Sequence, residues 1–461
     1  MLRGGIAPGG VAAGHAATAA AGLEILEAGG TAADAAVAAS LASCVAETVM
    51  TGLLGGAYAI HWDGEQAWNL DCFVDVPSGA GAGPVELQVP FGEELVHYAV
   101  GPGTCAVPGL PRGLGALHAR FGRLPWDRLV EPALRLAREG VVMPPAHAAC
   151  LAMLAPVFTM QPDGARIYAP AGRPLEQGEV LDQPGLATAL ELLADEGADS
   201  AYTGAIAALL LGIEGVPLTG DDLARYEARW LEPVAVAWLG RRVLTRAGLS
   251  GVPETLARLP RFRELDARER VHALLAALDG PELEGHTTNL VTVDAEGRAC
   301  VLTSSLGLGT GDFLPGLDLQ LNSMLGEVDL VREALQAGTR MASMMAPTLV
   351  LDPAGLELAI GSAGGTRLRT ALVAVAAGIL DEGLAAVDAV ERPRFHRAGD
   401  VVNAEPEVDE LALEELAAAG LQVRRWPGRH HYFGGVSLIG RYGAAGDPRR
   451  SGHAATLTRA A

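Results

Sequence analysis

The sequence predicts a mixed α+β protein, and three patterns carry this prediction. From Ala16 to Met50, apolar residues recur at helical spacing. From Leu114 to Ile213 the pattern is again mostly helical. From His286 onward the period changes to two, which is typical of strands joined by tight turns. The chain has 461 residues, of which 49% are hydrophobic and 19% charged, so it is long and apolar enough to bury a large core.

The N-terminal pattern predicts two helices followed by a hairpin. The Gly-Gly pair at 29–30 ends the first helix, and Thr31 is placed to cap the start of the second. After a glycine-rich segment, two apolar runs at 57–62 and 67–70 are separated by Asp-Gly at 63–64. The first third of the chain therefore combines helices with part of a sheet.

The middle of the chain predicts a helical layer. Its clearest helical stretches are 128–137 and 186–195, with prolines and glycines at the joints. The segment 253–281 is charged and helical in pattern, and we expect it to be a linker or a surface segment.

The last third predicts strands and one long helix. Alternating runs at 288–294 and 299–303 predict a second hairpin. Strands at 348–351 and 356–360 then lead through a glycine-rich turn into a helix that reaches Leu380. Backbone N–H groups become available where a strand passes through glycines into a helix.

Composition excludes several classes of function. All 34 basic residues are arginine, so neither a lysine Schiff base nor a P-loop lysine can form. The 55 acidic residues give a net charge of -21, which disfavours nucleic acid and anionic membranes as partners. The five cysteines show no CxxC spacing and are expected to be reduced and buried. Because His430 and His431 have no third ligand nearby, no metal is predicted, and no other cofactor is implied.

The N-terminal residues favour a cytoplasmic location. They run into an alanine- and glycine-rich stretch without an uninterrupted apolar segment ahead of the first helix. No run of 18 apolar residues occurs anywhere in the sequence, so no membrane-spanning helix is predicted.

A series of short motifs follows the chain from end to end. In order they are GGTAADAAVA at 29–38, VPGLPRG at 107–113, LPW at 124–126, EGADSAYTG at 196–204, LTGDDLA at 218–224, HTT at 286–288, APT at 346–348, GSAGGTR at 361–367 and RPRFH at 392–396. In this order they resemble the γ-glutamyltranspeptidase family of N-terminal-nucleophile hydrolases. The resemblance implies an α+β fold with a four-layer αββα sandwich and an additional helical layer. It also implies a precursor that cuts itself before a threonine nucleophile.

The family motif places this cleavage between His286 and Thr287. Residues 1–286 would then form a large-subunit-like region and 287–461 a small-subunit-like region that begins at the nucleophile, together making one αββα domain. A free α-amine has a pKa of about 7.7–8.0, so the amine of Thr287 could act as general base for its own hydroxyl. The pattern alone favours a simpler interpretation, in which Thr287 and Thr288 only open a β-strand, where threonine is common.

Three further residues are candidates for the catalytic centre. The resemblance implies that Gly364 and Gly365 supply the N–H groups of an oxyanion hole. A left-handed turn ahead of a helix is the simpler interpretation of these glycines, and both can hold together. Ser305 falls where the family has a second hydroxyl residue that positions the nucleophile, although a serine ending a strand accounts for it equally well.

The sequence departs from the family in the substrate pocket. Phe73 stands where the family has an arginine that clamps the substrate α-carboxylate, and an apolar ring cannot hold a carboxylate. Gly307 stands in place of an asparagine. Of two serines ahead of the APT motif, Ser343 remains and Met344 replaces the second.

The family's Asn-Asn-Gln-Met-Asp-Asp-like run, which binds the substrate ammonium, corresponds here to LNSMLGE at 321–327. Several of its polar groups are lost, with Glu327 one position away from the acidic pair. The candidate substrate-binding residues are therefore Ser343, Phe73, Glu327 and Asn322.

The resulting hypothesis is hydrolysis or transfer of a γ-glutamyl or related acyl group from a small-molecule amide through an ester on Thr287. Two alternatives stay open. The same mechanism could serve a non-glutamyl amide, because the losses concentrate in substrate recognition. An unprocessed pseudoenzyme could instead bind a ligand through the same cleft. The expected partners are the substrate and the two fragments of the chain itself, and a homo-oligomer is left open.

Overall fold

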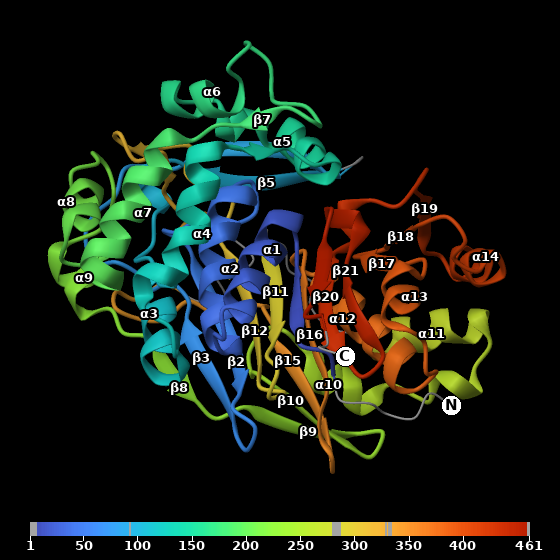
Figure 1. The fold of residues 1–461 in the computed structure, drawn as a ribbon. Helices are drawn as coiled ribbons and strands as arrows, with labels where there is room; N and C mark the ends of the chain where they lie inside the picture. Colours follow the sequence, from blue (N-terminus) through green and yellow to red (C-terminus); the bar gives the residue numbers. More distant parts are fainter. Residues whose placement is uncertain (1–6, 92–93, 279–286, 328–329, 331–333, 459–461) are drawn as a thin grey trace.

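Two antiparallel sheets lie face to face, and helices cover the outer face of each (Figure 1). The computed structural model describes residues 7–91, 94–278, 287–327, 330 and 334–458. The order of the layers is helix, sheet, sheet, helix, which confirms the predicted αββα architecture.

The first sheet holds the predicted hairpins of the N-terminal third and of the region after residue 287. In spatial order its strands are β22 (His453–Thr456), β1 (Gly10–Ala13), β11 (Thr288–Val293), β12 (Ala299–Ser305), β2 (Gly56–Trp62), β3 (Ala67–Cys72) and β8 (Arg229–Leu231). Successive residues face opposite layers, as the two-residue period requires. Leu290 and Leu302 lie in the core beneath the helices, whereas Val291 and Val301 lie in the core between the sheets.

The second sheet is built mainly from the C-terminal third. In spatial order its strands are β21 (Gly443–Gly446), β20 (Gly435–Gly440), β16 (Gly355–Ala363), β15 (Thr348–Asp352), β10 (Arg241–Thr245) and β9 (Val234–Trp238). Leu349, Ala359 and Ile439 meet the valines of the first sheet in the shared core. The strand pair predicted at 348–360 is β15 and β16.

Helices from the first half of the chain cover the first sheet. They are α1 (Ala16–Glu27), α2 (Ala32–Ala46), α3 (Leu110–Phe121), α4 (Trp126–Glu139), α7 (Pro184–Glu196), α8 (Ala205–Leu211) and α9 (Gly220–Arg225). All 15 residues of α2 are buried, because the sheet covers one face and α4 packs on the other. Its many alanines allow this close approach, and α4 and α7 supply the additional helical layer. Thr31 caps α2 in a capping box with Asp34, as predicted for its N-terminus.

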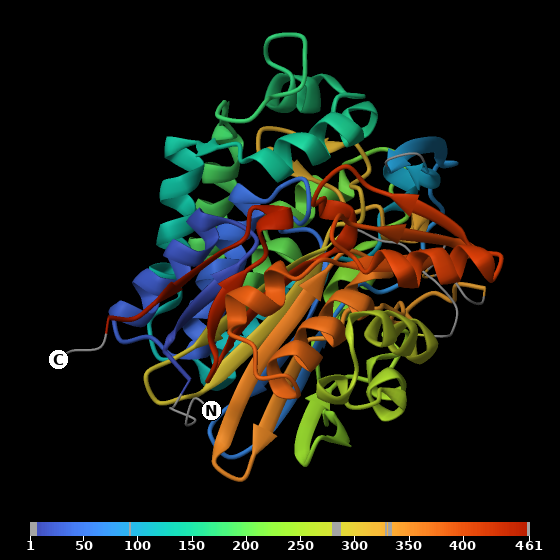
Figure 2. The same ribbon diagram turned by 90° about the vertical axis from the view of Figure 1, so that its right-hand side faces the viewer.

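Helices from the second half cover the second sheet, and Figure 2 views the molecule from their side. They are α10 (Val252–Arg258), α11 (Ala267–Ala277), α12 (Arg367–Leu380), α13 (Ala386–Glu391) and α14 (Glu410–Ala418), with a small sheet of β17 (Phe395–Ala398), β18 (Val401–Ala404) and β19 (Gln422–Arg425).

The described part of 253–281 is not a linker, but helices and turns at the surface that bury one face. Leu256, Phe262 and Leu274 are buried in the core of this layer. The charges of the segment lie on its outer side, where Arg261 and Arg263 pair with Asp381.

A smaller lobe caps one end of the sandwich (Figure 1). It contains β4 (Val85–Phe91), β5 (Glu94–Val100), β6 (Val141–Val142), α5 (Pro145–Phe158), α6 (Pro162–Tyr168) and β7 (Val180–Leu181). Two short strands, β13 (Phe313–Leu314) and β14 (Leu319–Gln320), follow β12 in the chain. Its own core includes Phe158, Tyr168 and Phe313.

All five cysteines are buried and unbridged, as predicted. Within the described part of the chain, none of the helices is long and apolar enough to cross a membrane. His430 caps the short turn η6 (His431–Phe433) by accepting the N–H of Tyr432 at its Nδ1, and no group of three or more His, Cys, Asp or Glu among the described residues could hold a metal ion.

A buried ionic cluster fastens the C-terminal segment to the second helical layer. Arg394 pairs with Asp447 at 2.6 Å, and Arg449 pairs with Glu405 at 2.5 Å and with Asp447 at 3.3 Å. All four side chains are almost completely buried, so removal of one partner leaves an uncompensated charge in the interior.

We therefore expect Arg449→Met to lower the free energy of unfolding by about 3–5 kcal/mol. The matched control is Arg128→Met, which breaks the exposed Arg128–Glu131 pair and should cost less than about 1 kcal/mol. Urea unfolding followed by tryptophan fluorescence measures both variants. Equal shifts of the two midpoints would contradict a structural role for the cluster.

Candidate active site

Thr287 lies at the point where the two sheets meet. It immediately precedes β11 and is buried, with 6% of its surface exposed. Its Oγ1 accepts a hydrogen bond of 2.8 Å from the backbone N–H of Gly364, at the end of β16 in the other sheet. Its carbonyl oxygen accepts a bond of 3.1 Å from Nη1 of Arg450. His286, the other residue of the predicted cleavage site, lies outside the described residues.

Gly364 and Gly365 form the turn between β16 and α12. Their φ angles of +122° and +58° fall in the left-handed region that favours glycine. A Cβ on Gly364 would lie 2.8 Å from the Cα of Gly434, so a side chain would displace this backbone. The turn aims the N–H of Gly364 at Thr287 and lies at the N-terminus of α12, whose dipole favours negative charge.

Ser305 is brought beside Thr287 by the register of the hairpin. Thr288 pairs with Ser304, so the next pair outward joins Thr287 and Ser305. The Oγ of Ser305 accepts the N–H of Gly307 at 3.0 Å. Ser305 and Thr287 line the same pocket.

This pocket, called the apolar pocket below, opens next to the nucleophile candidate. Its described lining residues are Phe73, Thr287, Ser305, Met324, Glu327, Leu330, Ser343, Met344, Met345, Gly365 and Leu368. Three of the four predicted substrate-binding residues, Phe73, Glu327 and Ser343, are therefore gathered around Thr287. The fourth, Asn322, is not among them.

Asn322 instead holds backbone segments together. Its Nδ2 donates to the carbonyl oxygens of Leu54 and Ala106, and its Oδ1 accepts from the N–H groups of Ala106 and Met324. The side chain is fully buried. These bonds fix the start of the turn η4 (Met324–Gly326), which carries Met324 and Glu327 into the apolar pocket.

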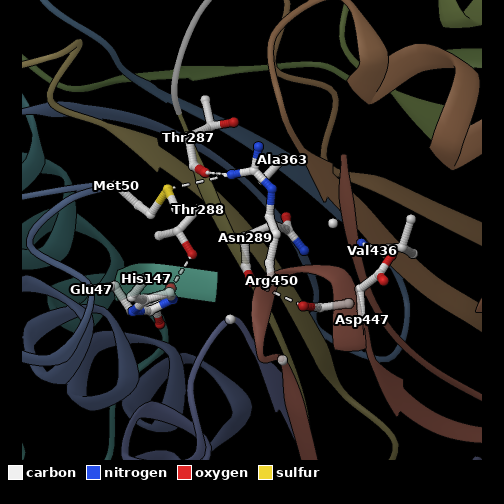
Figure 3. Close-up of a pocket in the computed structure, with 14 residues that line it drawn as sticks. Glu47, Met50, His147, Thr287, Thr288, Asn289, Ala363, Val436, Asp447 and Arg450 are labelled. Carbon is white, nitrogen blue, oxygen red and sulfur yellow. Dashed lines mark hydrogen bonds between the residues drawn. The ribbon is translucent and has the colours of Figure 1, made fainter. Parts of the chain in front are cut away.

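Thr287 also lines a second pocket, called the polar pocket below (Figure 3). It is lined by Gly14, Glu47, Met50, His147, Thr287, Thr288, Asn289, Ala363, Gly435, Val436, Ser437, Asp447, Arg450 and Gly452. Figure 3 shows Arg450 extending between Met50 and Thr287, and Thr288 pointing to Glu47. The polar pocket thus places Arg450 against Thr287 and Glu47 against the next residue, Thr288.

Glu47 is a buried carboxyl group that accepts from two threonine hydroxyls. Thr18 donates to its Oε1 at 2.7 Å, and Thr288 donates to its Oε2. Burial raises the pKa of Glu47 to about 7, although these hydrogen bonds and the charge of Arg450 act in the opposite direction. Helix α2 ends at Ala46 rather than Met50, and the turn that follows carries Glu47 to this position.

Arg450 is the buried cation of the polar pocket. Besides the carbonyl of Thr287, it donates to Sδ of Met50 and to the carbonyl of His431, both at 3.4 Å. Burial lowers the pKa of Arg450 to about 10, and the nearby Cys150, Asp447 and Glu47 partly offset this shift. The guanidinium remains charged at neutral pH.

Neither Glu47 nor Arg450 was predicted from the sequence. A signal for Glu47 was present, because it is the lone acidic residue in the otherwise uncharged stretch 35–60. Arg450 offered no such signal, since it follows another arginine in a short turn near the C-terminus.

The raised pKa of Glu47 predicts a pH-dependent stability. The unfolded carboxyl titrates near pH 4.3, so between about pH 4 and 7 the folded protein binds this proton more tightly than the unfolded chain does. The stabilisation that protonated Glu47 gives the folded state is complete below the unfolded pKa, and it is lost as the pH rises to about 7. As the pH rises from 5 to 8, we expect the free energy of unfolding of Glu47→Gln to increase relative to that of wild type by on the order of 3 kcal/mol.

Denaturant unfolding of both proteins at several pH values in this range measures the difference. Glu65→Gln, in the exposed turn between β2 and β3, is the control and should follow the wild-type pH dependence. A pH-independent difference between wild type and Glu47→Gln would show that Glu47 titrates alike in the folded and unfolded chains.

Comparisons with known proteins place this geometry in a family. A family model described as Gamma-glutamyltranspeptidase matches residues 18–279 and 267–457. The Acylase ACY 1 proenzyme of Pseudomonas sp. (strain SE83) is 27% identical over 496 residues, which covers 92% of this chain and 88% of that protein. The Glutathione hydrolase proenzyme of Pseudomonas aeruginosa is 28% identical over 453 residues, or 81% of this chain and 80% of that protein.

Solved structures agree with this fold. Cephalosporin acylase from Bacillus halodurans superimposes with a TM-score of 0.83 at 23% identity, covering 99% of this chain and 97% of its own. The gamma-glutamyltranspeptidase of Pseudomonas nitroreducens gives a TM-score of 0.50 at 28% identity, covering 60% of this chain and 84% of its own. Since the family model spans nearly the whole chain, the protein belongs to the gamma-glutamyltranspeptidase family of enzymes.

Proposed function

We propose that this enzyme is a self-processing amidohydrolase or acyltransferase that uses Thr287 as its N-terminal nucleophile on an amide other than γ-glutamyl. The hydrogen bond between the N–H of Gly364 and Oγ1 of Thr287 carries the proposal. This bond places the hydroxyl of Thr287 against the N–H of Gly364, a backbone donor that can stabilise an oxyanion. The names of two relatives as proenzymes support a chain that is cut after synthesis.

Self-processing needs only the chain itself and water. Oγ1 of Thr287 attacks the carbonyl carbon of residue 286, so that an ester replaces the peptide bond and the amine of Thr287 takes up the proton. Water then hydrolyses the ester. The products are a carboxyl group at residue 286 and a free α-amine at Thr287.

The same hydroxyl then serves the substrate. The α-amine takes the proton of Oγ1 as Oγ1 bonds to the substrate carbonyl carbon, and the N–H groups at Gly364 and Gly365 stabilise the resulting oxyanion. The C–N bond breaks, the departing amine receives the proton, and an acyl ester on Thr287 remains. Attack by water gives hydrolysis, and attack by a second amine gives transfer.

Arg450 supports the amine's role as a base. Its Nη1 lies 3.1 Å from the carbonyl oxygen of Thr287, within the same residue as the amine that processing would release. A buried positive charge bonded to the same residue disfavours a second charge there, so it would lower the pKa of the amine. The amine would then be uncharged, and able to accept a proton, over a wider range of pH.

The composition of the apolar pocket supports a non-glutamyl substrate. Relative to the family motif, Phe73 replaces the arginine that clamps the γ-glutamyl α-carboxylate, and Met344 replaces one of two serines. Both line the apolar pocket together with Met324, Leu330, Met345 and Leu368. Both a glutathione hydrolase and an acylase are among the relatives, so the family accommodates more than one acyl group.

The first test is the intact mass of the purified chain under denaturing conditions. We expect wild type to give two fragments, residues 1–286 and 287–461, and Thr287→Ala to remain one chain because it lacks the attacking hydroxyl. Thr287→Ser is the matched control, since it keeps a hydroxyl and should still be cleaved. If wild type stays whole, the protein is an unprocessed binding protein and the proposal fails.

A second test concerns the oxyanion hole. Gly364→Ala should lower kcat for amide hydrolysis by about a hundredfold to a thousandfold, because its Cβ would push the donor N–H away from Thr287. Gly297→Ala is the control: Gly297 also has a positive φ, of +79°, but no atom within 4 Å would meet its Cβ. Rates are compared per mole of cleaved enzyme. A similar loss in both variants would indicate general backbone strain instead.

A further inference from the structure

A cavity of about 180 Å³ lies in the second helical layer, between α11, α12 and the segments 392–395 and 407–409. None of its lining residues belongs to the apolar pocket or the polar pocket. We propose that this space, called the helical-layer cavity below, binds a small carboxylic acid. The carboxylate lies on Arg270 and Arg392, and a short hydrocarbon body fills the space between the helices. This site is separate from Thr287 and goes beyond the proposed function.

The two helices that enclose the cavity run antiparallel. Nη2 of Arg369, in the first turn of α12, donates to the carbonyl oxygen of Leu278 at 2.6 Å, just after the end of α11. At the other end, Arg270 near the start of α11 pairs with Glu382, just after the end of α12. The helical-layer cavity therefore has two distinct ends. Its Arg270 end lies about two helical turns from Leu278.

A small residue on α12 leaves this space open. Every residue of α12 is buried except Arg369 and Ala374. Ala374 lines the cavity together with Thr370, which precedes it by one turn on the same face of the helix. A larger side chain at position 374 would occupy the space between α11 and α12.

The middle of the helical-layer cavity is apolar. Its walls include Phe262, Val271, Leu274, Phe395 and Val408, all of which belong to the buried core of the second helical layer. Such side chains gain from contact with hydrocarbon. A cavity of about 150 Å³ is large enough for benzene, so one of about 180 Å³ has room for about six to eight carbon atoms.

Two arginines form the charged end of the cavity. Arg392 donates to both carboxylate oxygens of Glu382, and Arg270 donates to Oε2 of the same group. The side chains of Arg270 and Arg392 are 28% and 31% exposed and both residues line the cavity, whereas Glu382 does not. Among the described residues, Glu382 is the one acidic partner of either arginine. One carboxylate therefore balances two guanidinium groups, and a ligand carboxylate would supply the second negative charge.

The other charged residues of the lining are already balanced or open to water. Arg394 pairs with Asp447 at 2.6 Å. Asp409 caps α14, because its Oδ1 accepts the N–H of Ala412 at 2.9 Å. Glu407 is exposed, so solvent screens its charge. The shared pair of arginines is thus the part of the lining that lacks a full counter-charge, which favours an anionic ligand over a cationic one.

Isothermal titration calorimetry with three six-carbon compounds tests the proposal. Hexanoate carries a carboxylate, hexanamide is neutral, and hexylammonium carries a positive charge. For the wild-type protein we expect hexanoate to bind more tightly than either of the others by about tenfold to a hundredfold. The reason is that hexanoate alone completes the charge balance of the two arginines.

Two variants locate the bound acid. Arg392→Gln should weaken hexanoate binding by about tenfold or more and leave hexanamide binding unchanged, because it removes one charged donor. Ala374→Leu should weaken both compounds, because the new side chain fills the cavity while the arginines and a good helix-forming residue are kept. The matched controls are Arg138→Gln, which breaks an exposed pair with Glu191, and Ala208→Leu, at an exposed position of α8. Both controls should bind hexanoate as wild type does.

The urea midpoint of each variant reports whether it is folded, and Ala374→Leu locates the site even if Arg392→Gln is unstable. Hexanoate that binds wild type and the folded cavity variants equally well lies elsewhere, which overturns the proposal. Equal affinity for the three compounds, or a preference for hexylammonium, overturns the carboxylate as the recognised group. Failure of folded wild type to bind hexanoate overturns the site itself. These measurements do not require cleavage at Thr287, so the proposed function stands or falls separately.

Discussion

The contact between Thr287 and Gly364 is the constraint on which the site depends. It joins the start of β11, in the first sheet, to the end of β16, in the second, across 77 positions of sequence. Both strands are central in their sheets, so their ends are fixed by neighbours on either side. A small slip of one sheet over the other would part the hydroxyl from its donor. The large buried core between the sheets therefore also sets the geometry of the candidate site.

The polar pocket gives this centre its electrostatic character. In the uncleaved chain, the nitrogen of Thr287 is part of a neutral amide. Among the described residues that line the polar pocket, Arg450 contacts Thr287 and Glu47 contacts Thr288. In the proposed mechanism, cleavage adds an ionisable amine to the same enclosed space. With a pKa near 7, Glu47 is partly protonated at neutral pH, so the charge of Arg450 is only partly compensated there. Asp447 does not fully compensate it either, because it pairs with Arg394 and Arg449.

Much of the architecture was accessible from the sequence because it depends on local patterns. The capping box at Thr31 and the alternation along β11 and β12 each require only a few neighbouring residues. The surroundings of Thr287 were not accessible in this way. Glu47 contacts Thr288 and Arg450 contacts Thr287 from opposite ends of the chain, and periodicity carries no information about such contacts.

Two misjudgements have the same cause. The charges of 253–281 suggested a surface segment, yet one face of its helices is buried on the second sheet. Asn322 was selected by its place in a motif, but its amide is occupied by four backbone groups and lies outside the apolar pocket. In both cases the local pattern was present in the sequence, but what the side chains contact depends on the packing of distant segments.

Chemistry and specificity are carried by different parts of the structure. The proposed nucleophile, Thr287, and its donor, the N–H of Gly364, depend on strand ends and on two glycines whose positive φ angles disfavour side chains. The apolar pocket depends instead on side chains from separate loops, such as Phe73, Glu327 and Met344. A substitution in those loops changes the shape or charge of the pocket without moving β11 or β16. The proposed change of acyl group therefore requires no change in the mechanism, because the sandwich that aligns Thr287 with Gly364 is built from other residues.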